Sequence, residues 1–456
     1  MRPRTLWILL LLVAGLGAFV WFVERDLPGS DERAERAKRV LDLEAGEVSA
    51  ISWTRDGERV ALSRAGGAED PTWSLTEPLA ARADDGGVER LLDQLAGLEK
   101  RRTLESGEPG ELGLDPPRAV LTVATSAGER RLEIGGAIPA SDSMVVATGD
   151  GAPYYVVANG LWSELARPAG EWRSRDVFPG EPDDVARFAL TGEGERVAVA
   201  RRGDELWLEA PRVDRADEGT VSRFLSALTG LQVEEFVDDP DPAAESFGVE
   251  PPSGIVEVVR EDGTAWKLEL GAPAGGEEGG RWARAEGRVV RVADSLAEDL
   301  AREPDGWRSL AWATLAVYEI DAFEVRDADG SVSFVRVSGQ WERDGEQVEF
   351  NAVSDLLYAI TGTKAEALDA GAAVAGEPVL AVTLSPGDDE QLLEVFDSGG
   401  DRFPARTSGR ETTLWLGGDR VRDIRSKLAA ARAAESLAAP AADAEEAAAA
   451  VSGALD

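Results

Sequence analysis

The chain contains one seventeen-residue pattern twice, and this internal repetition constrains its fold more than any other feature. Residues 82–98 (RADDGGVERLLDQLAGL) and 215–231 (RADEGTVSRFLSALTGL) are identical at ten of the seventeen positions, without a gap. A third, looser copy lies at 350–363 (FNAVSDLLYAITGT). In all three, apolar residues recur at offsets of 0, 3, 4 and 7, which is the spacing of one face of an amphipathic helix. The glycines that close the copies stand where a C-cap glycine ends a helix; they are Gly97, Gly230 and Gly362.

The similarity extends on both sides of this helix. Alternating apolar runs around a glycine-containing turn begin at residues 51, 187 and 323, which is the signature of a β-hairpin. Strand-like runs follow the helix, and the first two copies end in Trp-Arg-Ser at 172–174 and 307–309. We therefore predict an α+β fold of three tandem repeats of about 130 residues, each built from antiparallel strands and hairpins plus an amphipathic helix.

The first segment of the chain carries no charge from Thr5 to Val23. At 1.5 Å per residue, a helix of this length would be about 28 Å long, close to the thickness of a bilayer core. Arg2 and Arg4 precede it, which by the positive-inside rule keeps the N-terminus in the cytoplasm. The alternative is a cleaved signal peptide with its site near residues 15–17. We expect an uncleaved transmembrane anchor in the bacterial inner (plasma) membrane, with the bulk of the chain periplasmic or otherwise extracytoplasmic.

These patterns give predicted boundaries along the whole chain. The cytoplasmic N-terminus and transmembrane anchor precede a charged stalk, three repeats, of which the third is divergent, and an Ala-rich disordered tail. The predicted ranges are 1–23, 24–46, 47–180, 181–313, 314–430 and 431–456.

Composition excludes several classes of function. The formal net charge is −38, from 48 basic and 86 acidic residues, so the chain repels phosphate backbones and we expect no nucleic-acid partner. The chain has no Cys and no His. A disulfide, a Cys nucleophile, a His-ligated zinc and a triad with an imidazole base are therefore all excluded.

The order of motifs resembles the bacterial domain-of-unknown-function family 4340. The shared features are an N-terminal anchor, a Trp strand, the helix V-x-x-L-L-x-x-L-x-G-L, then L-G-L-x-P-P, L-x-I-G and W-R-S. The resemblance covers residues 47 to about 430; the third copy lacks the Leu-Gly before its Pro, the Gly after Leu-Glu-Val and the closing W-R-S. What the resemblance implies is an exported accessory subunit beside an ABC-type transport system similar to those of gliding motility. The implied partners are the transporter permease and ATPase.

No catalytic, cofactor-binding or metal-ligating residue is predicted. DADG at 327–330 is similar to the start of a calcium loop, but a hairpin turn explains it better. Three evenly spaced tryptophans offer either a stacking platform for sugars or, more simply, core packing; they are Trp73, Trp207 and Trp341. The paired Trp and Arg at the repeat ends are candidates for inter-repeat or ligand contact; they are Trp172, Arg173, Trp307 and Arg308.

Three hypotheses for the function follow, in order of preference. The first is a non-enzymatic, membrane-anchored accessory protein that acts through protein–protein contacts of its repeats. The second is a module that binds an envelope glycan or lipid, which requires an aromatic-lined cleft between repeats. The third is a carboxylate-dependent hydrolase, which requires a facing Asp/Glu pair in a cleft of one repeat.

Overall fold

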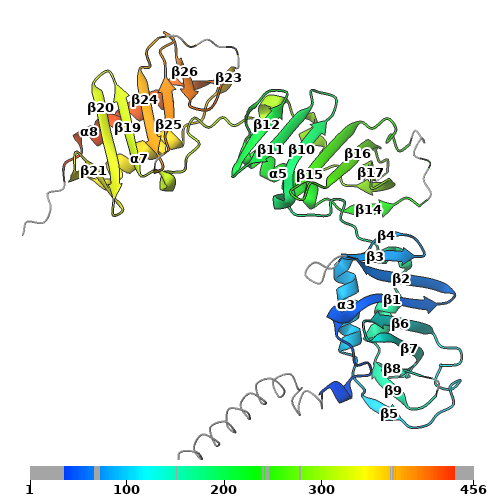
Figure 1. Cartoon of the computed structure of the whole chain (residues 1–456). Helices are drawn as coiled ribbons and strands as arrows, with labels where there is room; N and C mark the ends of the chain where they lie inside the picture. Colours follow the sequence, from blue (N-terminus) through cyan, green and yellow to red (C-terminus); the bar gives the residue numbers. More distant parts are fainter. Residues whose placement is uncertain are drawn as a thin grey trace, which may run out of the picture. The chain divides into compact units, whose positions relative to one another are not determined.

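The computed structural model describes residues 35–65, 72–149, 151–238, 241, 246–276, 279–369, 371, 374, 376–387 and 389–436. The chain divides into two compact units, Met1–Arg175 and Asp176–Asp456. The first unit carries one nine-stranded sheet and the second carries two, and all three sheets share one strand order (Figure 1). The prediction of three tandem repeats is confirmed.

Each repeat has the same succession of elements: three strands and a short edge strand, a helix, a short strand, four further strands and a closing helix. The first contains β1 (Val48–Arg55), β2 (Glu58–Ala65), β3 (Thr72–Glu77), β4 (Ala81–Arg82), α3 (Asp85–Ala96), β5 (Arg102–Leu104), β6 (Ala119–Thr125), β7 (Gly128–Ala137), β8 (Ser143–Ala147), β9 (Tyr154–Ala158) and α4 (Gly160–Leu165). The second contains β10 (Val185–Thr191), β11 (Val197–Arg202), β12 (Glu205–Ala210), β13 (Asp214–Arg215), α5 (Glu218–Thr229), β14 (Val233–Phe236), β15 (Gly254–Arg260), β16 (Ala265–Pro273), β17 (Arg281–Ala285), β18 (Arg288–Val292) and α6 (Ala297–Ala301). The third contains β19 (Ala322–Asp327), β20 (Gly330–Val337), β21 (Gln340–Arg343), β22 (Glu346–Gln347), α7 (Phe350–Thr361), β23 (Ala367–Asp369), β24 (Leu380–Ser385), β25 (Gln391–Val395), β26 (Arg402–Thr407), β27 (Thr413–Gly417) and α8 (Gly418–Ala433). Short 3₁₀ turns flank them, namely η2 (Ala45–Glu47), η3 (Ala169–Trp172), η4 (Pro182–Asp184), η5 (Pro304–Trp307) and η6 (Val317–Glu319).

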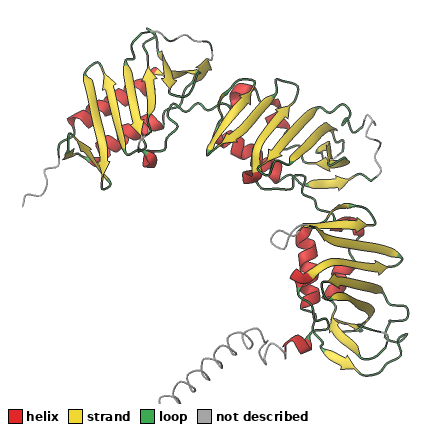
Figure 2. Cartoon of the chain, in the orientation of Figure 1, coloured by secondary structure: helices red, strands yellow, loops and turns green. Residues whose placement is uncertain are grey.

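The sheet is two antiparallel meanders joined at one central pair. In the first repeat the strand order is β4-β3-β2-β1-β6-β7-β8-β9-β5, and β1 pairs with β6 at the join. Because α3 connects β4 at one edge with β5 at the other, the helix has to cross the whole sheet. Figure 2 shows the helices of each repeat gathered on one face of its sheet.

The predicted apolar face of the central helix is the face that packs on the sheet. Burying each of its large side chains contributes about 1.5–3 kcal/mol to stability. In every repeat this face meets inward-pointing strand residues in a separate core. The buried helix residues are Val88, Leu91, Leu92 and Leu95, then Val221, Phe224, Leu225 and Leu228, then Val353, Leu356, Leu357 and Ile360.

A glycine ends each central helix because of a close carbonyl group rather than a left-handed backbone. Gly230 and Gly362 have φ values of −83° and −79°. A Cβ added to Gly230 would lie 3.0 Å from the carbonyl oxygen of Ser226, and one added to Gly362 would lie 2.8 Å from that of Tyr358. The glycine therefore lets the chain turn away tightly against the last helical turn.

The L-G-L-x-P-P and L-x-I-G motifs contact each other. Gly136 donates a backbone hydrogen bond of 2.8 Å to the carbonyl of Leu112, and a Cβ on Gly113 would lie 2.6 Å from the nitrogen of Gly136. In the second repeat a Cβ on Gly271 would overlap the carbonyl oxygen of Phe247. Each glycine is needed because the other segment passes so close. This contact explains why the third repeat lacks both glycines together.

The transmembrane part of the predicted fold class has to be corrected. The predicted span at residues 5–23 lies outside the described residues, and within the described ranges no helix is both long enough and apolar enough to cross a membrane. What the structure supports is a fold of three mostly antiparallel sheet repeats. The inner-membrane localisation rested on that span and is not retained.

The repeat boundaries differ by a few residues from the predicted ones. Arg39 forms an isolated β-bridge with Glu99, and Leu41 and Leu43 are buried in the first core, so part of the expected stalk belongs to the first repeat. At the other end α8 runs through Ala433, beyond the predicted limit of 430. The expected disordered tail lies outside the described residues from residue 437 onward.

Candidate binding site at the junction of the second and third repeats

The tryptophans of the two Trp-Arg-Ser segments are core residues. Trp172 and Trp307 are fully buried at the ends of η3 and η5. The ring of Trp172 lies 5.1 Å from that of Trp53, edge to face, and Trp307 lies 5.6 Å from Phe224. Both rings therefore stabilise their own repeat and are not exposed for stacking on a ligand.

The arginines of these segments end one repeat, and the next repeat begins shortly after them. The backbones of Arg173 and Arg308 form the last β-bridges of their repeats, with Ala83 and Ala216. The arginine side chains differ in their surroundings. Arg173 Nε donates to the carbonyl of Gly170 within the first repeat at 3.3 Å. Arg308 lies in a buried cluster that includes the third repeat.

Arg308 is held by the second and third repeats together. Its Nε donates to Oδ2 of Asp214 on β13 at 2.7 Å, and its Nη2 donates to the hydroxyl of Thr412 in the third repeat at 2.7 Å. Thr412 in turn donates to Oδ2 of Asp214 at 2.9 Å. The third guanidinium nitrogen, Nη1, donates to the carboxylate of Asp305 at 2.8 Å. Every nitrogen of this buried guanidinium therefore has an acceptor, as burial of a charge requires.

Arg410 completes the cluster from the β26–β27 loop of the third repeat. It donates from Nε to Oδ1 of Asp214 at 2.6 Å and from Nη2 to Oδ2 at 3.1 Å, which is the two-pronged geometry of a strong arginine–carboxylate pair. Its Nη2 also donates to the carbonyl of Ser309, in the connection between the repeats, at 2.6 Å. The side chains of Asp214 and Arg410 are 1% and 3% exposed, so water does not screen the pair.

The electrostatics of the cluster favour the charged carboxylate. Burial alone would raise the pKa of Asp214. The hydrogen bonds and positive charges of Arg410 and Arg308 outweigh burial, so the pKa of Asp214 is held below its usual value of 3.8. Two arginines and one aspartate thus form a paired, buried cluster that joins the second repeat to the third.

Arg308 was among the predicted site residues, whereas Asp214 and Arg410, the other two members of this cluster, were not. Asp214 pairs in register with Leu208, and the corresponding residue of the first repeat, opposite Leu75, is Ala81. The repeat pattern therefore does not mark Asp214. Arg410 lies in the divergent third copy, where the motifs used for the alignment are missing. A single Asp in a short edge strand was the one available signal.

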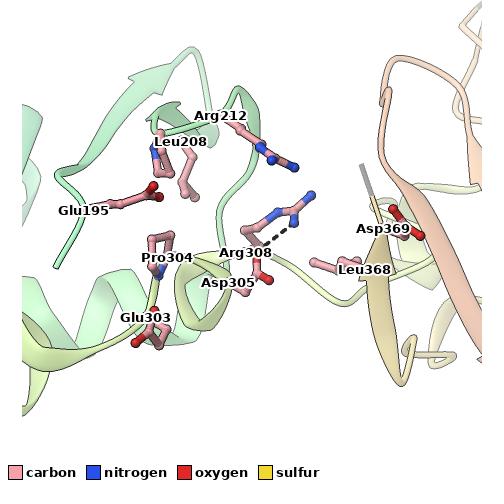
Figure 3. A pocket seen from close by; sticks show the side chains of 10 residues that line it. Glu195, Leu208, Arg212, Glu303, Pro304, Asp305, Arg308, Leu368 and Asp369 are labelled. Carbon is pink, nitrogen blue, oxygen red and sulfur yellow. Dashed lines mark hydrogen bonds and ion pairs between the residues drawn. The ribbon is translucent and has the colours of Figure 1, made fainter. Parts of the chain in front are cut away.

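A cavity of about 440 Å³ opens beside the cluster, within the usual size range of small-molecule sites. Figure 3 shows side chains from both repeats around it, with Arg212 and Arg308 on one side and Leu368 and Asp369 on β23 on the other. The remaining lining residues are Glu195, Leu208, Pro211, Glu303, Pro304 and Asp305. The lining combines charged side chains with leucines and prolines and contains no aromatic side chain.

The interpretation of DADG as a calcium loop gains no support. Among the described residues, no group of three or more acidic side chains is placed to hold a metal ion. The DADG sequence is the turn between β19 and β20, and the nitrogen of Asp329 donates to Oδ1 of Asp327 at 2.9 Å. The same carboxylate accepts two hydrogen bonds, at 3.0 and 2.8 Å, from Arg432. The turn is therefore tied to α8 by an ion pair.

The three evenly spaced tryptophans are not equivalent. Trp73 and Trp341 are buried in their cores, whereas Trp207 is half-buried and points to the other face of its sheet. The backbone contact that Trp73 makes with Ala83 is made in the second repeat by Leu206 with Ala216. Leu206 is therefore the counterpart of Trp73, and Trp207 follows it by one position. A shift of one residue moves a strand side chain to the opposite face.

Trp207 lies between two arginines on that open face. The guanidinium carbons of Arg202 and Arg215 are 5.4 and 5.1 Å from its ring centre, and its Nε1 donates to Glu205 at 3.0 Å. All three neighbours belong to the same edge of the second sheet. The interpretation of a recurring tryptophan strand holds for the first and third repeats and is wrong for the second.

Comparison with known proteins gives one result. No curated protein matches the sequence significantly. Residues 73–214 and again residues 207–379 match the family described as a domain of unknown function (DUF4340). Each matched segment runs from the third strand of one repeat into the next repeat, so both include a Trp-Arg-Ser connection. Together the two segments cover well over half of the sequence, and the chain belongs to the DUF4340 family.

Proposed function

We propose that the chain is a non-enzymatic accessory protein that binds protein partners through its repeats. The observation that carries this proposal is the buried cluster of Asp214, Arg308 and Arg410, which joins the second and third repeats. A catalytic role is not needed to explain that cluster, because Asp214 pairs with both arginines and Arg308 pairs with Asp305 as well.

Fixing two repeats to each other favours binding of a large partner. Association of a protein with two freely moving domains has to order them first, and that ordering subtracts from the binding free energy. Two repeats held by buried ion pairs present one preorganised surface and avoid most of this cost. A small-molecule enzyme would gain less from such a joint than a protein that engages another protein over both repeats.

The family resemblance indicates which partners to test. Components of an ABC-type transport system, the permease and the ATPase, are the candidate partners that the resemblance implies. The surface charge of the chain is strongly negative overall, so a partner has to contact it through local apolar or basic regions of the chain or through its own basic groups.

The glycan-binding alternative receives less support from the same region. Proteins that bind sugars place aromatic rings against them, and the cavity between the second and third repeats is lined by charged, proline and leucine side chains. Protein contact therefore remains the preferred proposal.

Purification of the tagged full-length chain from its native cells in mild detergent tests this proposal. We expect the permease and ATPase of one transport system to be recovered with the chain in a fixed molar ratio. The Asp183→Ala variant changes only an exposed side chain, and we expect it to recover the permease and ATPase in the same molar ratio. Recovery of the chain alone, folded and in good yield, would contradict the proposed function.

A further inference from the structure

The helix-bearing face of the third repeat carries exposed aromatic side chains. Phe350 and Tyr358 lie on α7 and are 41% and 62% exposed. Tyr318 is 79% exposed on η6, and η6 packs against α7. Large aromatic side chains at such exposure do not contribute the free energy that burial would provide. A partner that covers them therefore gains this free energy on binding.

The first two repeats show that the fold does not require these aromatic residues. All three central helices have twelve residues and start directly after the short edge strand, so their positions correspond one to one. At the positions of Tyr318, Phe350 and Tyr358, the first repeat has Gly46, Asp85 and Asp93. The second repeat has Asp183, Glu218 and Ser226. The aromatic residues are a property of the third repeat alone.

The third repeat also has a basic closing helix. α8 has five basic and two acidic residues, in a chain whose totals are 48 basic and 86 acidic. The corresponding helices α4 (GLWSEL) and α6 (AEDLA) are short and have no basic residue. Arg420, Arg422 and Arg425 are exposed, and none of them makes an ion pair within the part of the chain that the structure describes. The guanidinium groups of Arg420 and Arg422 are therefore available to a partner, and that of Arg425 also acts electrostatically on the carboxylate of Asp327 at the β19–β20 turn.

The aromatic and basic residues lie on neighbouring antiparallel helices. Figure 1 shows α7 and α8 on the same side of the third sheet. The end of α8 is fixed beside the start of α7, because Ser436 bridges Val348 and Arg343 donates to the carbonyl of Ala431 at 3.0 Å. The first half of α8, with its three exposed arginines, is therefore level with the second half of α7, which carries Tyr358.

We propose that this surface, formed by Tyr318, Phe350, Tyr358, Arg420, Arg422 and Arg425, docks an acidic amphipathic segment of a protein partner. The inference rests on the proposed function and deepens it by naming the contact surface. Carboxylates of the segment pair with the three guanidinium groups, and its apolar side chains cover the aromatic rings. The net charge of −38 repels extended polyanions such as nucleic acids and anionic bilayers, whereas a short acidic segment meets only this basic region.

Site-specific photocrosslinking in native cells tests the surface directly. Benzoylphenylalanine is placed at position 358 of the full-length chain and, as matched controls, at the corresponding positions 226 and 93. We expect a crosslinked protein at position 358 alone, with the attached peptide rich in Asp and Glu. A crosslink to lipid or nucleic acid, no crosslink, or an equal yield of the same protein at position 226 would overturn the proposal.

Charge reversal separates the role of the arginines from general repulsion. The combined Arg420→Glu, Arg422→Glu and Arg425→Glu variant should lower the crosslink yield at position 358 at least about tenfold. The control reverses Arg130, Arg223 and Arg326, which changes the net charge equally, and should leave the yield within about twofold. Equal loss in both variants would contradict a specific surface. If partners are recovered with the chain while position 358 remains uncrosslinked, the proposed function stands and the docking surface is wrong.

Discussion

Asp214 of the second repeat and Arg410 of the third are 196 residues apart in the sequence and share two hydrogen bonds, of 2.6 and 3.1 Å, in the protein interior. Arg308 binds the same carboxylate from the other side. The joint between these repeats therefore depends on one carboxylate that pairs with two buried guanidinium groups. Such an arrangement is sensitive to removal of its shared member, because Arg410 would then lose its carboxylate partner in the interior and Arg308 would keep only its pair with Asp305.

Replacement of Asp214 is expected to destabilise the second compact unit strongly. Asp214→Ala, which introduces the residue found at position 81 of the first repeat, should lower the free energy of unfolding by about 3–5 kcal/mol, since it removes the carboxylate that pairs with Arg410 and one of the two that pair with Arg308. Denaturant unfolding followed by tryptophan fluorescence measures the loss. Asp183→Ala removes an exposed carboxylate of the same repeat and should change the free energy by less than about 0.5 kcal/mol. Equal effects of the two substitutions would show that the buried cluster contributes no more to the free energy of unfolding than an exposed carboxylate does.

The same carboxylate should make the unit sensitive to acid. The pKa of Asp214 is lower in the folded protein than its usual value of 3.8, so the folded state prefers the charged form. Its contribution to stability is therefore fully present above pH 3.8 and is lost as the pH falls through the lower pKa of the folded state. The stability difference between wild type and Asp214→Asn, measured by unfolding at a series of pH values, should shrink as the pH falls below 3.8. A difference that stays constant would contradict this assignment.

The two kinds of tryptophan should respond differently to truncation. Trp341→Ala empties a fully buried core position and should cost about 3–5 kcal/mol in the free energy of unfolding. Trp207→Ala removes a half-buried ring between Arg202 and Arg215 and should cost about 1 kcal/mol or less. Chemical denaturation of each variant, with far-UV circular dichroism as the signal, distinguishes the two. A comparable loss for both would place Trp207 in the core.

Arg343 should stabilise the end of α8. Its guanidinium donates to the carbonyls of Ala431, Arg432 and Ala434 at 3.0, 2.7 and 2.9 Å, where a helix has unpaired acceptors. Arg343→Ala should lower the stability of the third repeat by about 1–3 kcal/mol. Arg343→Lys should recover only part, because an ammonium group cannot reach all three carbonyls as a planar guanidinium does. Hydrogen exchange of the last α8 amides reports the change, and Arg326→Ala is the exposed control.

The repeats themselves could be predicted because each signal is local. The spacing of Val88, Leu91, Leu92 and Leu95 determines a helix and its buried face within one short segment, and the turns and alternating runs determine the hairpins in the same way. β5 could not be predicted to lie at the far edge beside β9, since its place depends on how far α3 carries the chain across the sheet. Element identity was thus available from the sequence, whereas the order in the sheet required tertiary packing.

The junction could not be predicted because its members come from three distant segments. Arg308 is a candidate through its Trp-Arg-Ser segment, but the first repeat has Ala81 at the position of Asp214, and Arg410 lies in the divergent third copy. The wrong prediction for Trp207 has a different cause, which is the equal spacing of the tryptophans in the sequence. Equal spacing suggests that Trp73 and Trp207 are equivalent, but aligning the central helices at Asp85 and Glu218 makes Leu206 the counterpart of Trp73.

Rigid connection of the second and third repeats is tested most directly by a distance measurement between them. The chain has no Cys, so Ser226→Cys and Asn351→Cys provide two unique, exposed spin-label sites, one on the central helix of each repeat. Pulsed electron paramagnetic resonance of the full-length chain should give a single narrow distance distribution, which becomes broad when Asp214→Ala is added. A broad distribution with Asp214 intact would contradict a fixed joint, and with it the preorganised binding surface on which the proposed function rests.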